Sequence, residues 1–151
     1  MGIDKDIQQV KFRNLHQKSA ITLIYTLSWM REKTHAIFDA EAITPQQFNL
    51  LRILRGCFPQ PLSTLQIRER MLEKMSDTSR IVDRLVLKGL AKKNICKNDK
   101  RLVDVSISTK GQKLLEKIDA YESKMDAIIG NLSQAEAKTL NNLLDKIRNS
   151  D

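Results

Sequence analysis

Hydrophobic residues are spaced for helices over most of the chain, and they alternate with polar residues only within 91–108. Residues 5–40 contain no proline or glycine, and they predict one long helix or two helices in succession. The alternation of Val103, Val105 and Ile107 with polar residues predicts a strand that pairs with an earlier strand as a hairpin. The expected fold class is therefore mainly α with a small β-hairpin (α+β).

Sequence signals for helix starts and stops divide the rest of the chain. Pro45 suits the first position of a helix that Gly56 should end. Ser76 is expected to cap a later helix, with Asp77 in its first turn and Gly89 at its end. Three capping boxes, each an N-cap with Gln or Glu three residues later, are formed by Thr44 with Gln47, Ser63 with Gln66, and Ser133 with Glu136.

A stripe of hydrophobic residues near the C-terminus has the alternating spacing of a helix-pairing seam, and it predicts one helix over 112–132. A small lobe cannot bury so long a stripe by itself, so the helix is expected to pair with a second copy of the chain. The last helix should also have its leucines and Ile147 inward. The stripe consists of Leu114, Ile118, Tyr121, Met125, Ile128 and Leu132, and the inward residues of the last helix are Leu140, Leu143, Leu144 and Ile147.

The positive charge is concentrated in the middle of the chain. The formal net charge is +8, and residues 51–113 carry 15 Lys and Arg against 6 Asp and Glu, a balance of +9. The remaining +1 and −2 belong to residues 1–50 and 114–151. A localised excess of this kind is typical of a surface that binds a polyanion.

The sequence also carries signals about the compartment. No apolar run approaches the ~18 residues of a membrane span, and the polar N-terminus lacks the hydrophobic core of a signal peptide. Cys57 and Cys96 are too few for a disulfide framework. We therefore expect a cytoplasmic protein that does not bind membranes.

The helix expected over 76–88 has one apolar face and one polar face. Short polar side chains in its first turn can reach base edges in a major groove, and the longer cations that follow can pair with guanine or hold phosphates. Asp83 is expected to orient Arg84 or another cation. A solvated surface helix is the alternative, but the short helix before it and the hairpin after it favour double-stranded DNA as partner. The candidate DNA-binding residues here are Ser76, Thr78, Ser79, Arg80, Arg84 and Lys88.

The tip of the hairpin is the second candidate DNA-binding element. Lys97, Lys100 and Arg101 lie there, with Asp99 placed to brace Arg101. A basic β-ribbon tip can enter the minor groove, where the negative potential favours arginine. An ordinary charged hairpin tip is the alternative. Ser63, at the start of the preceding short helix, completes the candidate set.

Four segments of the chain resemble, in their order and spacing, the sequence pattern of the multiple antibiotic resistance regulator (MarR) family of winged-helix transcription factors. They are residues 78–85, 88–90, 99–101 and 107–111. The resemblance covers nearly the whole chain in element order and is sharpest from 62 to 111. Two features depart from the family pattern, namely Lys92-Lys93 in place of an acidic-basic pair and a longer, proline-rich loop at 58–61.

The resemblance implies one domain over 1–151 that works as a homodimer on a palindromic site. A winged helix-turn-helix lobe at 44–109 would bind the DNA, and helical regions at 1–40 and 112–151 would form the dimer. Arg101 would be the wing arginine in the minor groove and Asp99 its acidic partner. Two recognition helices would lie about one DNA turn, roughly 34 Å, apart. Such regulators are mostly repressors released by a small ligand or by oxidation.

Effectors of the family are small, often aromatic or anionic molecules, and they bind between the dimer helices and the DNA-binding lobe. The candidate pocket residues are His16, Tyr25, Trp29, Arg31 and Phe38. The alternative for the aromatic residues is a place in the core or the dimer interface. The two histidines are too far apart for a helical metal pair, so we expect no metal and no cofactor.

A cysteine could provide oxidation sensing. Relatives that sense oxidation use a cysteine near the N-terminus, and residues 1–56 contain none. Cys96 lies among lysines on the wing, which favours a lowered thiol pKa and an effect of oxidation on DNA contact. A passive strand cysteine is the alternative.

Two other classes of function, an enzyme and a protein-binding module, are alternatives to a DNA-binding regulator. An enzyme is not expected, because the chain lacks a nucleophile elbow, a P-loop, a dinucleotide fingerprint and a zinc-protease motif. A winged helix whose basic face binds an acidic protein partner remains the alternative. The steep salt dependence of DNA binding would help to separate it from a regulator.

Overall fold

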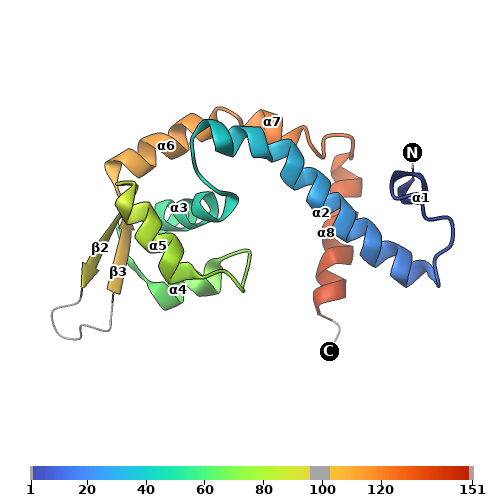
Figure 1. The fold of residues 1–151 in the computed structure, drawn as a ribbon, viewed down its shortest axis with the longest axis horizontal. Coiled ribbons are helices and arrows are strands. Elements are labelled where there is room, and N and C mark those ends of the chain that lie inside the picture. The colour runs from blue at the N-terminus through green and yellow to red at the C-terminus, as the bar shows by residue number, and fades with distance from the viewer. Residues whose placement is uncertain (1, 96–102, 150–151) are drawn as a thin grey trace. The chain divides into compact units, whose positions relative to one another are not determined.

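The computed structural model describes residues 2–95 and 103–149. Most of them are helical, and three short strands in the middle of the chain form a small antiparallel sheet (Figure 1). The elements in chain order are α1 (Ile3–Asp6), α2 (Leu15–Ala40), α3 (Pro45–Cys57), β1 (Leu62–Ser63), α4 (Thr64–Arg70), α5 (Thr78–Leu87), β2 (Ala91–Ile95), β3 (Val103–Ile107), α6 (Thr109–Asp119), α7 (Glu122–Asp126) and α8 (Gln134–Arg148).

The chain divides into two structural units. Unit 1 consists of Met1–Ala36 and Asp126–Asp151, and unit 2 is the continuous segment Ile37–Met125. Unit 2 therefore contains the end of α2, the helices α3 to α6, most of α7 and the whole sheet. The predicted fold class, mainly helical with a small β-hairpin, is confirmed.

Unit 2 has a closely packed hydrophobic core. The core joins α3, α4, α5, the sheet and α6, because each contributes residues that are at most 2% exposed. Burial of one such side chain contributes about 1.5–3 kcal/mol. The most deeply buried residues are Leu50, Leu51, Leu54, Ile67, Met71, Val82, Leu85, Val105, Leu115 and Ile118.

The sheet has the strand order β1-β3-β2, and both pairings are antiparallel. The predicted hairpin pairs Ala91 with Ile107 and Ile95 with Val103. The short strand β1 was not predicted. Its Leu62 is opposite Val105, so α4 begins directly at the edge of the sheet. This pairing fixes the first helix of the helix-turn-helix relative to the wing.

The end of α5 is joined to the start of α6 by a compact set of hydrogen bonds. Gly89 has φ +70°, a conformation that favours glycine. The hydroxyl of Ser108 donates to the carbonyl oxygen of Gly89 at 2.7 Å, and the backbone N–H of Ser108 donates to Leu90 at 3.1 Å. A Cβ added to Gly111 would lie 2.2 Å from the carbonyl oxygen of Leu90. Only glycine therefore fits where α6 crosses this turn.

The prediction of a single helix over 112–132 is wrong. α6 ends at Asp119, α7 covers only Glu122–Asp126, and turns follow up to the start of α8. The hydrophobic spacing continues across this break, but the residues before and after it lie in different environments. Leu115 and Ile118 are buried in the core of unit 2, whereas Leu132 is 37% exposed. The predicted stripe therefore does not form one continuous seam.

Most helix starts lie where the capping signals put them. Thr44, Ser63 and Ser133 each form the complete capping box that the sequence predicts. The prediction for α5 is wrong by one residue, since Asp77 is the N-cap and accepts a hydrogen bond from the N–H of Arg80. Gly56 does not stop α3, which continues to Cys57.

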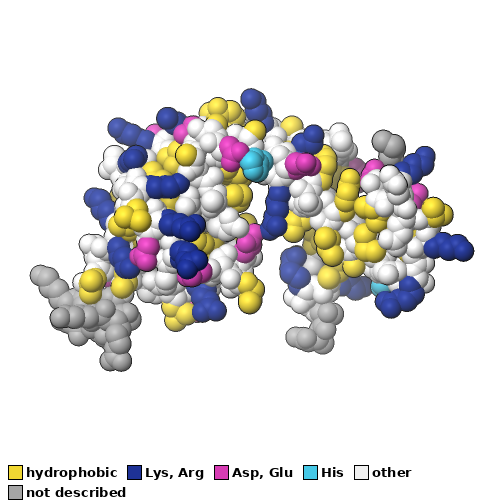
Figure 2. Space-filling model, viewed as in Figure 1, with side chains coloured by type: hydrophobic (Ala, Val, Ile, Leu, Met, Phe, Trp, Pro, Cys, Tyr) yellow, Lys and Arg dark blue, Asp and Glu magenta, His cyan; other side chains and the backbone are white. Residues whose placement is uncertain are grey.

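Unit 1 contains few buried residues. The region 5–40 forms two helices rather than one, with α1 ending at Asp6 and α2 beginning at Leu15. Along α8, Leu140, Leu143 and Ile147 are 39–57% exposed, so the prediction that they face inward is wrong within one chain. Figure 2 shows hydrophobic side chains on the surface of this unit. None of the helices described is long and apolar enough to cross a membrane.

Candidate nucleic-acid interface

The helix α5 separates a buried apolar face from an exposed basic face. Val82 and Leu85 are at most 1% exposed, and Ile81 and Val86 pack against the same core. The polar residues Arg80, Asp83, Arg84 and Lys88 are all exposed, as the sequence predicts. In Figure 1 the β2–β3 hairpin extends beside α5. A helix held in this way can place its outer side chains in a groove of DNA.

The arginines of α5 are available to a partner. Arg80 and Arg84 are exposed, and the guanidinium of Arg80 is only loosely paired with Asp77, at 3.9 Å between Nε and Oδ2. Exposed ion pairs of this kind contribute about 0–1 kcal/mol, so an anionic partner can displace them. Figure 2 shows Lys and Arg side chains gathered on this face of unit 2.

Asp83 is paired with a cation on the wing. The ammonium of Lys93 on β2 lies 2.8 Å from Oδ1 of Asp83. The sequence predicts that Asp83 orients Arg84 or another cation, and the partner is Lys93. The contact links the outer face of α5 to the hairpin. Because the carboxylate of Asp83 binds Lys93, it does not occupy Arg84.

A hollow of about 420 Å³ lies between α4 and the start of α5. Two hydroxyl groups at the hollow, Ser76 Oγ and Thr78 Oγ1, are buried and have no hydrogen-bond partner among the described residues. Thr78 itself is only 5% exposed, so its side chain lies in the wall rather than on the outer face. Buried hydroxyls are usually hydrogen-bonded, so these two differ from most buried hydroxyls in lacking a described partner.

The hollow also shows a candidate residue that sequence reasoning missed. Arg68 lines the hollow from α4, together with Thr64 and Leu65, and its side chain is exposed. The signal was available, since Arg68 follows Leu65 by one helical turn on the exposed side of α4. Ser79, predicted to bind DNA, is exposed on the opposite wall.

Two other predicted DNA-binding residues are engaged within unit 2. The hydroxyl of Ser63 caps α4 by accepting from the N–H of Gln66 at 3.2 Å. The ammonium of Lys88 donates to the carbonyl oxygen of Ala42, and it lies 3.3 Å from Oε1 of Gln47. Lys88 therefore binds the segment before α3.

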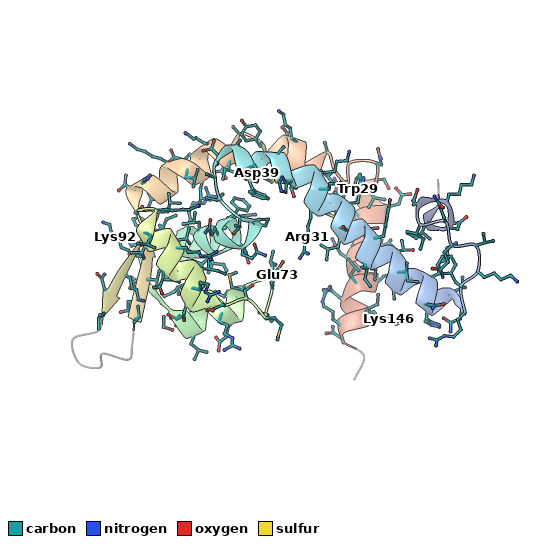
Figure 3. The ribbon with its side chains drawn as sticks, viewed as in Figure 1. Trp29, Arg31, Asp39, Glu73, Lys92 and Lys146 are labelled. Carbon is teal, nitrogen blue, oxygen red and sulfur yellow. The ribbon has the colours of Figure 1, made fainter. Side chains whose placement is uncertain are left out.

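The wing tip lies outside the described residues. The residues concerned are Lys97, Asp99, Lys100 and Arg101, together with Cys96. The part of the wing that is described carries further cations, because both Lys92 and Lys93 are exposed on β2. Figure 3 shows Lys92 at the beginning of this strand, near the end of α5.

The candidate effector residues belong to both units, with Phe38 in unit 2 and the other four in unit 1. Phe38 is 6% exposed and packs against Phe48 in unit 2, with ring centroids 5.0 Å apart, so it lies in the hydrophobic core, the alternative that the sequence leaves open for the aromatic residues. Tyr25 and Trp29 line a hollow of about 400 Å³ in unit 1, next to Ile3. His16 and Arg31 are exposed on α2 and do not line that hollow; Trp29 and Arg31 are labelled in Figure 3.

One charged pair ties the core helices together. The guanidinium of Arg55 on α3 donates two hydrogen bonds to the carboxylate of Asp119 on α6, at 2.6 and 3.1 Å. This hydrogen bonding raises the pKa of Arg55. Among the described residues, no group of three or more His, Cys, Asp or Glu side chains is placed to hold a metal ion. The cations over α4 and α5 are therefore the chemistry that this surface offers.

The fold is similar to that of several solved transcription regulators. A MarR transcription factor from Planctomyces limnophilus is 29% identical, with a TM-score of 0.69 over 89% of this chain and 98% of the other. A mutant MarR from E. coli, solved in complex with operator DNA, is 22% identical, with a TM-score of 0.79 over 91% and 99% of the two chains. BpsR from Bordetella bronchiseptica is 18% identical, with a TM-score of 0.79 over 93% and 100%. No protein-family model matches the sequence.

Proposed function

Because the chain is a winged-helix protein of the MarR family of transcription regulators, we propose that it binds a palindromic DNA site as a homodimer. The single observation that carries this proposal is the outer face of α5. Its exposed Arg80 and Arg84 follow Ser79 along the helix, and residues 76–79 line a hollow where two buried hydroxyls have no described partner. Long cations next to unpaired hydrogen-bonding groups are complementary to base edges and phosphates.

We assign different roles to the residues of this surface. Arg80, Arg84 and Ser79 are exposed on α5 and read bases in the major groove. Arg68, which lines the hollow with an exposed side chain, holds a phosphate that borders that groove. Ser76 and Thr78, whose hydroxyls are buried, form part of the wall beside it. The wing carries Lys97, Lys100 and Arg101 to the neighbouring minor groove, with Asp99 bracing Arg101. The similar fold of the E. coli protein that was solved with operator DNA supports DNA as the partner in this proposal.

The dimer is proposed to form through unit 1. In one chain, α2 exposes Ile24 and Leu27 by 71% and 51%, and α8 exposes Leu143 and Ile147 by 55% and 57%. Monomeric proteins rarely expose so many large hydrophobic side chains on neighbouring turns, and a second copy would cover them. The proposed dimer therefore forms through α2 and α8 of unit 1, and not through a continuous seam over 112–132.

A repressor released by a small ligand is the proposed mode of action. The BpsR structure concerns regulation of DNA binding by 6-hydroxynicotinic acid, and a regulator from Streptomyces coelicolor was solved with its natural ligand. The hollow beside Tyr25 and Trp29 is the proposed place for an aromatic effector, since it offers stacking surfaces. Release from operator DNA on adding such a compound would support this mode.

The test is selection of a binding site from random duplexes, followed by affinity measurements over a range of salt. A selected sequence with two-fold symmetry is expected, and log K should fall linearly with log salt because phosphate contacts release counterions. Arg80→Ala should cost about 1–3 kcal/mol on the selected site. Arg148→Ala on α8 is the matched control and should leave the affinity unchanged.

Two results would contradict the proposal. If the selection returns no common sequence, even at low salt, sequence-specific DNA binding is ruled out. If the parent and the Arg80→Ala variant bind the selected site with equal affinity, α5 is not the helix that reads the bases. If an acidic protein then bound through α5, the winged helix would be a protein-binding module.

A further inference from the structure

We propose, on the basis of the DNA binding proposed above, that Leu65 on α4 determines specificity by contacting the methyl group of a thymine. Leu65 lines the hollow of about 420 Å³ between α4 and the start of α5. Its side chain is 65% exposed. The other described residues that line the hollow have polar side chains. The hollow therefore offers one apolar contact within a polar surface.

The fold does not require a leucine at position 65. The segment around α4 is anchored in the core by Leu62, Ile67 and Met71, which are at most 6% exposed. Within the described part of the chain, Leu65 belongs neither to this core nor to the partly buried residues packed against it. The start of α4 is fixed by the capping box of Ser63. A polar residue would therefore serve α4 equally well at this position.

The location of Leu65 distinguishes it from an ordinary exposed leucine. Single exposed hydrophobic residues are common on protein surfaces and need no special explanation. Leu65, however, shares the hollow with Ser79, an exposed residue in the first turn of the helix that we propose reads bases. The helices α4 and α5 lie side by side (Figure 1). A base edge that contacts Ser79 would therefore come within reach of Leu65.

Thymine is the base whose edge matches this pair of side chains. In the major groove, thymine presents the acceptor O4 next to its C5-methyl group. The hydroxyl of Ser79 can donate to O4 while Leu65 covers the methyl group. Cytosine presents an amino group and no methyl group, and the purines present only polar groups. Thymine alone therefore satisfies both side chains.

The charges around the hollow favour DNA over a protein segment as the occupant. Arg68 lines the hollow with an exposed side chain, and Arg80 and Arg84 follow on the exposed face of α5. The carboxylate of Asp77 accepts a hydrogen bond from the backbone N–H of Arg80 and lies 3.9 Å from its guanidinium, which reduces repulsion of a phosphate. A protein partner commonly buries about 800 Å² on each side, which calls for a larger surface than this hollow.

The test compares duplexes that contain thymine or uracil at the same position. Uracil lacks only the methyl group, so it keeps O4 and leaves the phosphate contacts unchanged. The duplex is the site selected from random sequences, and each thymine that the selection requires is replaced in turn in both half-sites. We expect one position at which uracil weakens binding by the parent about fourfold for each half-site. This loss corresponds to ~0.8 kcal/mol for one methyl group removed from an apolar contact.

Two variants show whether Leu65 makes this contact. Leu65→Ala should bind the thymine and uracil duplexes equally at that position, because the side chain that covers the methyl group is gone. A selection repeated with this variant should lose the preference for thymine there and keep the rest of the sequence. Leu72→Ala, at a leucine that is 83% exposed and does not line the hollow, is the matched control and should keep the preference of the parent.

Several results would overturn the proposal, and they separate it from the proposed function. If the parent binds a selected site and no replacement of thymine by uracil weakens binding, DNA binding stands but Leu65 does not read a methyl group. The same holds if one replacement weakens binding by the parent and by Leu65→Ala equally. If Leu65→Ala changes the sedimentation of the protein without DNA, the leucine belongs to a contact between copies. A selection that returns no common sequence contradicts both proposals.

Discussion

Unit 2 and unit 1 differ sharply in what they bury. Among the described residues, every buried hydrophobic side chain except Ile3 belongs to unit 2. Unit 1 contains most of α2 and almost all of α8, yet Ile24, Leu27 and Leu143 are more than half exposed. The hydrophobic effect can stabilise unit 2 within one chain, but it can stabilise unit 1 only if another surface covers these residues.

The difference indicates a division of labour within one short chain. Unit 2 needs no partner to hold α5 and the wing in place, so its polar surface is free for DNA. Unit 1 exposes many large hydrophobic side chains, which suits association with an identical copy. Four predictions test this comparison, starting with the largest effect.

Leu85→Ala is expected to have the largest effect on stability. Leu85 is fully buried between α5 and the rest of the core, so its removal leaves a cavity and should cost about 2–5 kcal/mol. Chemical denaturation at a fixed protein concentration measures this loss. A cost below about 1 kcal/mol would mean that the core of unit 2 is not packed as described.

Leu143→Asp should act on association rather than on the winged helix. If a second copy covers Leu143, a buried carboxylate should raise the dissociation constant of the dimer at least about a hundredfold. Sedimentation velocity over a range of concentrations measures the change. Leu65→Asp, at an exposed leucine of unit 2, is the control and should leave the dimer intact. Equal association of the two variants would contradict the role of unit 1.

Gly111→Ala tests the junction between α5 and α6. Its Cβ would meet the carbonyl oxygen of Leu90 at 2.2 Å, so overpacking should cost about 1–3 kcal/mol. Gly56→Ala is the matched control, because a Cβ there meets nothing within 4 Å and Gly56 lies inside α3. This control should be stabilised by roughly 0.5–1 kcal/mol, and thermal melts of both variants measure the contrast. Equal melts would show that the close approach at Gly111 has no energetic weight.

Ser133→Ala should have the smallest effect, at the start of α8 in unit 1. Hydrogen bonds from Ser133 lower the pKa of Glu136, so this carboxylate adds stability above its ordinary pKa. The contribution is lost as the pH falls through the lowered value. The variant should raise the pKa of Glu136 towards its ordinary range, as an NMR titration would measure. An unchanged pKa would rule out the cap as its cause.

Local features of this fold could be predicted from the sequence. The capping boxes at Thr44, Ser63 and Ser133 depend on residues three positions apart, and all three form. The apolar face of α5 was also predictable, because helical spacing determines which residues share a face. The pairing of Asp83 followed from charge, although its partner Lys93 did not.

Features that depend on distant segments were not predictable. The break after Asp119 is hidden because the hydrophobic spacing continues through it. Phe38 looks like a pocket residue in sequence, but its packing on Phe48 requires the turn between α2 and α3. Lys88 binds the carbonyl oxygen of Ala42 from 46 positions away, so its role depends on the tertiary fold.

In the proposed complex, unit 1 pairs two chains so that two copies of unit 2 read one DNA site. Sedimentation equilibrium of the protein mixed with its selected duplex tests it most directly. The account predicts two copies of the chain on each duplex, and a Leu143→Asp variant that no longer forms this complex at the same concentration. One copy bound to each duplex, with equal affinity in the parent and the variant, would contradict it.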